Sequence, residues 1–318
     1  MRKGDGTMFE SIISQIEQYD TIIIHRHKKP DGDAIGSQVG LKQLILANYP
    51  DKTVLCVGDE PGRYGFVEES APDEVADEKY ADALAIILDT SAAHLISDER
   101  YTTAKQTARI DHHIFCEKIA EIEVTDTSYE SCCGLIASLA MEAGWTLPAI
   151  AAKALYTGMV TDSGRFRYDS TTPETLRRAA YLLEAGFDTN DIYRNLYADD
   201  FSYIRLRAQF VLKVQFTDQG VAYIYTTADE ARESGVDTFT ISRAMVGVMS
   251  EIRGVDRWVN FTETDEGVLC ELRSSRYNIN PIAVKYGGGG HEKASGATVP
   301  DRQTAMRMLA DLDQLAEV

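Results

Sequence analysis

Short apolar runs alternate with helical patterns along the first half of the chain. Strands are expected over 21–24, 54–57, 84–88 and 107–110, and an amphipathic helix is expected over 35–48. Continuous apolar runs separated by helices indicate strands that are buried on both faces of a parallel sheet. We therefore predict an α/β fold, with a doubly wound, mainly parallel sheet in the N-terminal part of the chain.

The pattern changes in the second half of the chain. Three helices are expected, over 149–160, 173–185 and 188–198. Beyond residue 208 strand-and-turn patterns return, and four strands are expected, over 210–216, 221–226, 258–263 and 268–273. These changes predict three parts: an N-terminal domain over 1–190, a helical linker over 191–208, and a smaller α/β domain with a mixed sheet over 209–318.

The composition is that of a folded protein with an acidic surface. Of the 318 residues, 44% are hydrophobic and 26% are charged, which excludes a disordered, collagenous or coiled-coil chain. Lys and Arg number 32 against 50 Asp and Glu, for a net charge of −18. Proteins that hold long nucleic acids by neutralising phosphates carry a basic face. A long duplex is therefore an unsuitable partner, and any nucleic-acid ligand should be short or bound through metal ions.

Nothing in the sequence indicates a membrane or an exported protein. No stretch approaches the roughly 20 apolar residues that span a bilayer, and residues 1–13 lack the apolar core of a signal peptide. The five cysteines are an odd number without framework spacing, and adjacent Cys132 and Cys133 are expected to be small buried residues at a helix start. We expect a cytoplasmic protein.

A polar segment directly after the first predicted strand is rich in metal-ligand types. His27, Asp31 and Asp33 offer one imidazole and two carboxylates between a strand and a helix. Mg²⁺ and Mn²⁺ prefer oxygen ligands, and an added imidazole shifts the preference toward Mn²⁺. Gly32 and Gly36 would allow a tight turn that points both carboxylates inward. The alternative is a polar loop with an aspartate as helix N-cap.

Three further polar clusters follow apolar segments. Asp89 follows the third predicted strand, Asp111-His112-His113 follows the fourth, and Asp162 lies in a turn after a helix. Each aspartate alone could be a helix cap. An acidic partner on an imidazole, however, fixes the tautomer of that ring and strengthens it as a ligand. Four such clusters in this chain order favour one shared site over four separate caps.

A glycine-rich stretch marks the second half of the chain. Four consecutive glycines at 287–290 precede His291, and Arg273 and Ser274 lie upstream. Consecutive glycines cost backbone entropy, and close approach of backbone N–H groups to a phosphate is the natural reason for them. A flexible linker is the alternative, but linkers lack the flanking His, Lys and Ala pattern.

Taken together, these segments resemble the DHH phosphoesterases. The four metal motifs of that family are matched by His27-Lys-Lys-Pro-Asp31-Gly-Asp33, Asp89, Asp111-His112-His113 and Thr161-Asp162-Ser-Gly164. Residues 287–297 resemble the glycine-rich motif of the DHH-associated C-terminal domain. The resemblance covers roughly residues 10–315. Within the family, such a compact two-domain chain is similar to the nano-RNase/pAp phosphatase group, which includes enzymes that cut linear pApA to AMP in cyclic di-AMP turnover.

The resemblance implies a cofactor, a reaction and a role for each motif residue. Two Mn²⁺ ions per chain are expected, with Co²⁺ or Mg²⁺ as substitutes, and a water activated by both would hydrolyse the phosphoester. One ion would be held by His27, Asp31 and Asp89, and the other by Asp33, Asp89, His112 and Asp162. His113, backed by Asp111, would face the substrate phosphate, so that the implied catalytic residues are His113, Asp111 and Asp89. The implied substrate-binding residues are Arg273, Ser274, Gly289, Gly290 and His291.

Two other functions are alternatives to this one. A manganese-dependent pyrophosphatase shares the metal motifs but ends in a basic Ser-Arg-Lys-type signature, where this chain has 287–291. A non-catalytic nucleotide sensor would have lost metal ligands, whereas every expected position is filled here. His25 is expected to be a packed, hydrogen-bonded residue, and Phe166, between two arginines, is a candidate base-stacking residue. The expected partner is a short RNA, dinucleotide or nucleotide, and the chain is expected to be a monomer or a homodimer.

Overall fold

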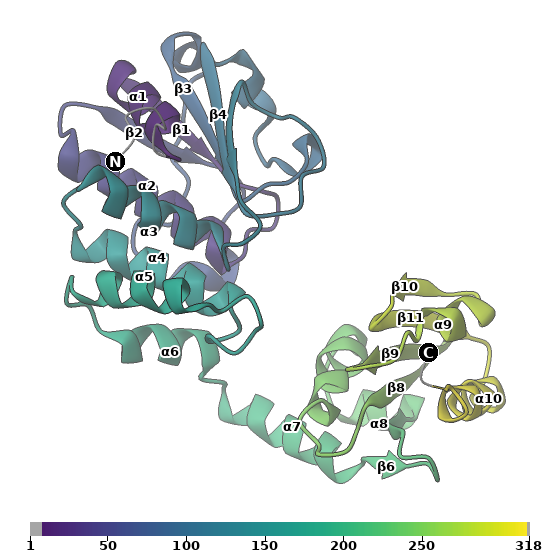
Figure 1. Cartoon of the computed structure of the whole chain (residues 1–318). Coiled ribbons are helices and arrows are strands. Elements are labelled where there is room, and N and C mark those ends of the chain that lie inside the picture. The colour runs from purple at the N-terminus through teal and green to yellow at the C-terminus, as the bar shows by residue number, and fades with distance from the viewer. Residues whose placement is uncertain (1–7, 317–318) are drawn as a thin grey trace. The chain divides into compact units, whose positions relative to one another are not determined.

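The computed structural model describes residues 8–316. Between Ala198 and Asp199 the chain divides into two compact units, called here the N-terminal unit and the C-terminal unit (Figure 1). The division falls inside the 191–208 segment that was expected to link two domains. Each unit has a sheet and a core of its own.

The N-terminal unit is built on a five-stranded, entirely parallel sheet in the order β2-β1-β3-β4-β5. Its strands are β1 Thr21–His25, β2 Thr53–Val57, β3 Leu84–Leu88, β4 Gln106–Asp111 and β5 Ile122–Thr125. Its helices are α1 Glu10–Gln18, α2 Gly32–Asn48, α3 Cys132–Ala143, α4 Ala149–Asp162, α5 Pro173–Leu183 and α6 Thr189–Tyr197. The α/β fold and the parallel sheet predicted from the apolar runs are confirmed.

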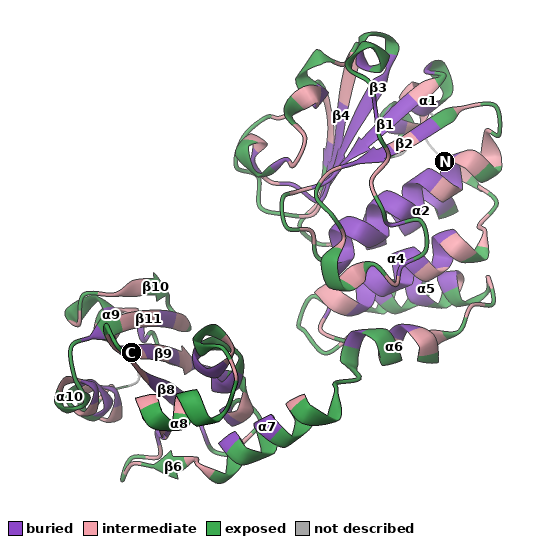
Figure 2. Cartoon of the chain, turned by 180° about the vertical axis from the view of Figure 1, so that it is seen from behind, coloured by how far each residue is buried: buried purple, intermediate pink, exposed green. Residues whose placement is uncertain are grey.

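Both faces of this sheet are buried, and for that reason its strands are apolar at consecutive positions (Figure 2). Ile22 and Ile24 of β1 pack into the cluster formed with α1, α2, α3 and α4. Ile23, which points the opposite way, packs against Tyr80 in the short 3-10 segment Asp77–Asp82. One face is thus covered by long helices and the other by short 3-10 segments.

The C-terminal unit has a six-stranded mixed sheet in the order β10-β11-β9-β8-β7-β6. Only β7 and β8 pair in parallel, and the other neighbours are antiparallel. Its strands are β6 Gln215–Phe216, β7 Ala222–Thr226, β8 Arg257–Thr264, β9 Gly267–Ser274, β10 Gly289–His291 and β11 Ala294–Val299. Its helices are α7 Phe201–Leu212, α8 Ala228–Glu233, α9 Asn280–Lys285 and α10 Arg302–Asp313. The prediction of a smaller α/β domain with a mixed sheet is confirmed.

Different elements cover the two faces of the second sheet. On one face Val259 and Phe261 of β8 pack against α10. On the other face Trp258 packs beside a π-helical turn, Thr240–Ala244, and the 3-10 segment Met245–Met249 that follows it. Glu271 and Arg273 of β9, on this second face, line a pocket.

One predicted element is wrong. A strand was expected over 210–216, but α7 continues to Leu212, and only Gln215–Phe216 form a strand. Leu206 and Phe210, one helical turn apart, are buried in the same apolar cluster, so the tertiary contacts select the helix.

Two further expectations concern membranes and cysteines. Within residues 8–316, no helix is both long enough and apolar enough to cross a membrane. All five cysteines are free thiols, and Cys132 and Cys133 are the buried first residues of α3, as predicted.

Candidate functional site

The candidate site lies at the carboxyl ends of three neighbouring parallel strands. His27 follows β1, Asp89 follows β3, and His112 and His113 follow β4. Ligand sites in open parallel sheets form at this edge, because all strands there end in loops that face the same way. The structure therefore brings together the side chains that the sequence placed after separate strands.

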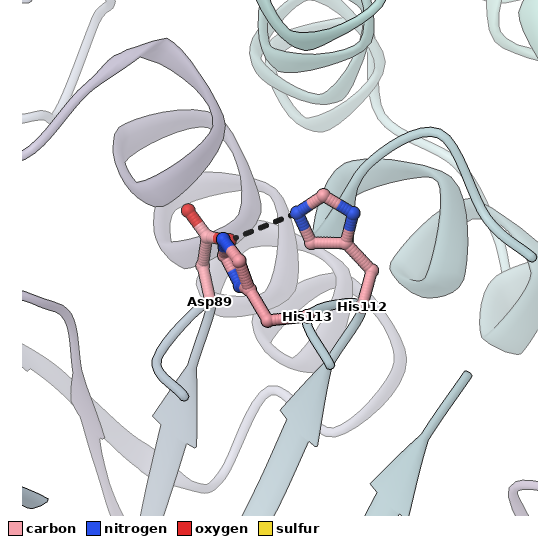
Figure 3. A group of neighbouring side chains, drawn as sticks. All are labelled: Asp89, His112 and His113. Atoms are coloured by element: carbon pink, nitrogen blue, oxygen red, sulfur yellow. Dashed lines mark ion pairs between the residues drawn. The ribbon is translucent and has the colours of Figure 1, made fainter. Parts of the chain in front are cut away.

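Asp89 lies beside His112 and His113, and an ion-pair contact joins it to His112 (Figure 3). Its carboxylate is 2% exposed, and its backbone is left-handed with φ of 52°. Its Oδ2 lies 3.5 Å from Nε2 of His27, and its Oδ1 lies 3.4 Å from Nε2 of His112. Oδ1 accepts no hydrogen bond from any residue that the structure describes. Asp89 thus presents one oxygen to each of two histidines.

Three overlapping groups of donor atoms surround Asp89. Within each group the donor atoms lie within 4.8 Å of one another, and the groups are His27, Asp31 and Asp89; Asp33, His112 and Asp162; and Asp89, His112 and His113. Nε2 of His112 lies 3.7 Å from Asp33 and 3.5 Å from Asp162. These separations exceed hydrogen-bond lengths. The side chains therefore do not simply pair with one another. They converge on shared centres, as the ligands of a metal ion do.

A stripe of glycines on α2 brings two of these carboxylates together. Cβ atoms added at Gly32, Gly36 and Gly40 would lie within 2.4–2.5 Å of atoms of α4. Because these positions recur every four residues on one face, α2 and α4 pack with their backbones close together. Asp33 at the start of α2 and Asp162 at the end of α4 consequently meet at His112. The tight-turn role predicted for Gly32 and Gly36 is wrong, since both lie within the helix.

The first two aspartates of the motif are fixed by helix N-termini. Asp31 caps α2 and accepts from the backbone N–H groups of Asp33 and Ala34 at 2.9 and 3.0 Å. Asp33 accepts from the N–H groups of Cys132 and Cys133 at the start of α3, at 2.6 and 2.8 Å. Asp31 is therefore both a helix cap and a member of the donor cluster, and the two interpretations weighed for it are compatible.

Each of the three histidines of the site contacts a polar partner through its Nδ1 atom. The partners are the carbonyl oxygen of Lys28 for His27, at 2.8 Å, and the carbonyl oxygen of Tyr129 for His112, at 3.4 Å. Nδ1 of His113 lies 2.8 Å from Oδ1 of Asp111, a buried carboxylate near Arg109. Such partners fix the tautomer and leave Nε2 free for a ligand.

Burial and crowding of like charges perturb the carboxylates. Burial, reinforced by the neighbouring charge of Asp89, raises the pKa of Asp33 well above its usual value. The same two causes raise the pKa of Asp162 to about 6. Uncompensated buried carboxylates are costly unless a cation is nearby. A pocket of about 220 Å³, lined by His27, Asp31, Asp89, His113 and Asp162 among others, opens at these groups.

The second predicted cluster lies in the C-terminal unit. Arg273, Gly289, Gly290 and His291 line a pocket of about 1020 Å³, called here the C-terminal pocket. Ser274 does not line this pocket. Its hydroxyl accepts hydrogen bonds from the N–H groups of Arg276 and Tyr277 and donates one to a carbonyl oxygen.

The glycine-rich stretch is an ordered part of this unit. Gly289–His291 form β10, which pairs with β11. A Cβ atom at Gly288 would lie 2.1 Å from the carbonyl oxygen of Gly296, so a larger residue would not fit. The linker alternative is therefore wrong.

Two residues that the sequence singled out belong to the core. His25 is fully buried between Tyr80 and Tyr101, and neither ring nitrogen has a hydrogen-bond partner among the described residues. It is packed as expected but not hydrogen-bonded. Phe166 packs on Tyr156, with ring centroids 5.8 Å apart, and this contact favours a core role over base stacking.

Sequence reasoning missed other residues of these sites. Phe239, Arg243 and Glu271 line the C-terminal pocket, yet they belong to no motif. Glu130 and Arg178 form a buried ion pair behind Tyr129, with 2.6 Å between Oε2 and Nη2. The only available signal was a charged residue within a mainly apolar segment.

Comparison with known proteins agrees with this geometry. Residues 21–159 match the DHH family, N-terminal domain, and residues 220–317 match the DHHA1 domain. The bifunctional oligoribonuclease and PAP phosphatase NrnA of Bacillus subtilis (strain 168) is 35% identical over 313 residues, which are 98% of this chain and 99% of that protein. The chain belongs to the DHH family. The predicted enzyme class, a phosphoesterase, is thereby confirmed.

Other known proteins are similar to this chain over its full length. The Mycoplasma genitalium protein named bifunctional oligoribonuclease and PAP phosphatase NrnA is 33% identical over 316 residues, with 98% of both chains covered. An exopolyphosphatase-related protein from Bacteroides fragilis, known from a crystal structure, has a TM-score of 0.79 and 26% identity. That match covers 99% of this chain and 98% of the other. The similarity thus extends over both units.

Proposed function

We propose that this DHH protein hydrolyses phosphoester bonds in short oligoribonucleotides, in linear dinucleotides such as pApA, and in pAp, with two Mn²⁺ ions. The observation that carries the proposal is Asp89, whose two oxygens face two separate groups of imidazole and carboxylate donors. The names of the Bacillus and Mycoplasma relatives, oligoribonuclease and PAP phosphatase, support the choice of substrates.

The donor atoms fit two divalent ions. The first ion would be held by His27, Asp31 and Asp89, and the second by Asp33, Asp89, His112 and Asp162. The Oδ1 atom of Asp89, which is buried and accepts no hydrogen bond within residues 8–316, and the crowded carboxylates around it support this assignment. Mixed oxygen and imidazole donors suit Mn²⁺, and Co²⁺ or Mg²⁺ could take the same positions. Paired ions of this kind activate a water and neutralise charge on the phosphate.

His113 would contact the substrate phosphate. Its hydrogen bond with Asp111 orients the ring, and the same hydrogen bond raises the pKa of His113 above its usual value. A protonated imidazole attracts an anionic phosphate and can donate a proton to it. Asp111 therefore acts as a positioning residue for His113.

The C-terminal pocket would hold the nucleotide. Arg273 and His291 would supply charge, and Gly289 and Gly290 would supply backbone N–H groups without obstructing side chains. Ser274 would contribute indirectly, since it fixes the turn at 274–277 through two backbone N–H groups. The cytoplasmic location and the oligomeric state, monomer or homodimer, stay predictions.

A release assay tests this proposal. The protein is incubated with pAp, pApA, a short RNA and pyrophosphate, each with Mn²⁺ and with excess chelator. We expect chelator-sensitive release of AMP from the first two substrates and of mononucleotides from the RNA. Asp89→Asn, which keeps a residue type that tolerates positive φ, should remain folded and inactive. Cleavage of pyrophosphate alone, or full turnover by folded Asp89→Asn, would reject the proposal.

A further inference from the structure

The C-terminal pocket has a wall that phosphate binding does not explain. Its volume of about 1020 Å³ could hold a whole nucleotide. Arg273 and the glycine-rich strand account for one side. Another part of the lining comes from the π-helical turn Thr240–Ala244 and the residue before it, namely Phe239, Ser242 and Arg243. π-Helical turns occur often at functional sites.

Phe239 is an aromatic side chain left open in this pocket. It is 66% exposed, and the guanidinium carbon of Arg243 lies 5.4 Å from its ring centroid. An exposed aromatic ring beside an arginine is the usual platform on which a nucleobase stacks. A phosphate group has no planar ring that could stack on Phe239.

Ser242 is a buried hydroxyl without a partner. Its side chain is 2% exposed and lines the C-terminal pocket, yet Oγ forms no hydrogen bond with any described residue. The turn that carries it is held in place, since Nδ2 of Asn260 donates to the carbonyl oxygens of Ile241 and Ser242 at 2.7 and 2.9 Å. A buried polar group of this kind is normally satisfied by water or by a ligand.

Glu271 is a carboxylate on the floor of a pocket expected to bind phosphate. One oxygen accepts from Nε of Arg243 at 3.1 Å, and the other lies 3.1 Å from Nη1 of Arg273. Each carboxylate oxygen can accept a second hydrogen bond. The acceptor positions of Glu271 that the two arginines leave open suit a ligand that brings N–H donors as well as a phosphate.

We propose that Phe239, Ser242 and Glu271 form a nucleobase site that prefers bases with an exocyclic amino group. The base would stack on Phe239, its amino group would donate to Glu271, and its ring atoms would bond with the Ser242 hydroxyl. Adenine, guanine and cytosine carry that amino group. Uracil has a carbonyl oxygen in its place, and its one donor, the ring N3–H, lies between two carbonyl oxygens that Glu271 repels. This inference rests on the proposed function for the phosphate part of the ligand.

Calorimetric titration of the Mn²⁺-loaded full chain with AMP, UMP and ribose 5-phosphate tests the site. The phosphate contribution is shared by the three ligands and cancels in the comparison. We expect AMP to bind about tenfold tighter than UMP, the effect of one hydrogen bond to a charged group. Ribose 5-phosphate should bind more weakly than either nucleotide, because it lacks a base to stack.

Two variants separate stacking from amino-group recognition. Phe239→Ala should weaken the binding of AMP about tenfold and leave the binding of ribose 5-phosphate unchanged. The control is Phe201→Ala, at a 73% exposed phenylalanine outside the pocket, which should alter the binding of neither ligand. Glu271→Gln should remove the preference for AMP over UMP. Equal binding of AMP and ribose 5-phosphate, or no effect of Phe239→Ala, would overturn the inference while the phosphate site stands. Failure of all three ligands to bind would instead reject the nucleotide pocket of the proposed function.

Discussion

Replacing Arg178 by Leu should strongly destabilise the N-terminal unit. Nη2 of Arg178 lies 2.6 Å from Oε2 of Glu130, and the hydroxyl of Thr175 donates to the same oxygen at 2.8 Å. The two charged side chains are 9% and 0% exposed. Without the arginine, the carboxylate of Glu130 would remain buried and unpaired, which costs about 3–5 kcal/mol. That is a large share of the free energy of unfolding of a folded protein, which is typically about 5–15 kcal/mol.

The same loss should reach the proposed metal ligands. The guanidinium of Arg178 lies 4.4 Å from the ring centroid of Tyr129, whose carbonyl oxygen is the partner of Nδ1 of His112. Ser131, next to Glu130, caps α3, and the first N–H groups of that helix hold Asp33. We therefore expect Arg178→Leu to weaken Mn²⁺ binding as well as folding.

Urea unfolding measures the first effect. The fluorescence of Trp145 follows the N-terminal unit if Trp258, the only other tryptophan, is changed to Phe in every variant. Arg177→Leu is the matched control, since Arg177 is the neighbouring residue on α5 and its ion pair with Glu174 is exposed. The double variant Glu130→Met/Arg178→Leu removes both charges and should recover much of the stability. If Arg178→Leu unfolds at the same urea concentration as Arg177→Leu, the reasoning is refuted.

Two further predictions concern helix packing and pH. Gly36→Ala should lower the free energy of unfolding by about 1–3 kcal/mol and weaken Mn²⁺ binding, because the new Cβ would lie 2.4 Å from the carbonyl oxygen of Ala154. Gly247→Ala, at a position with open space around it, is the control. Equal stability of the two variants would contradict the close packing of α2 and α4. In metal-free protein, burial lowers the pKa values of His27 and His112, but neighbouring aspartates outweigh burial and raise them to about 11 and about 10. Because the folded state keeps protons that the unfolded chain releases above pH 6.5, the stability contributed by these two histidines should be full below that pH. It should be lost as the pH rises through about 10 and about 11. Melting of chelator-treated protein across this range checks the sign, and a melting temperature that rises with pH would contradict it.

The local parts of the site could be predicted from the sequence. His27, Asp89 and His112 each follow an apolar strand, and parallel strands end at the same edge of a sheet, so their proximity follows from the pattern. The capping role of Asp31 and its place in the cluster of donor side chains both follow from its position at the start of a helix.

Contacts between distant segments could not be predicted in this way. The glycine stripe of α2 is meaningful only once α4 is known to pack on it, and a single sequence does not reveal that partner. The apolar residues of the segment over 210–216 fit the periodicity of a helix as well as that of a strand. Burial of Phe210 beside the π-helical turn favours the helix. Likewise, Arg243 and Glu271 meet only because the turn after α8 folds over β9.

The number of Mn²⁺ ions bound per chain tests the central claim most directly. Chelator-stripped protein, wild type and Asp89→Asn, is titrated with Mn²⁺ by calorimetry, and the hydrolysis of pAp is followed at each addition. We expect two ions per wild-type chain, activity that appears as the second site fills, and loss of both the two-ion stoichiometry and the activity in folded Asp89→Asn. A single ion in the wild-type chain, or two ions bound equally well by Asp89→Asn, would contradict a centre in which Asp89 joins two metal sites.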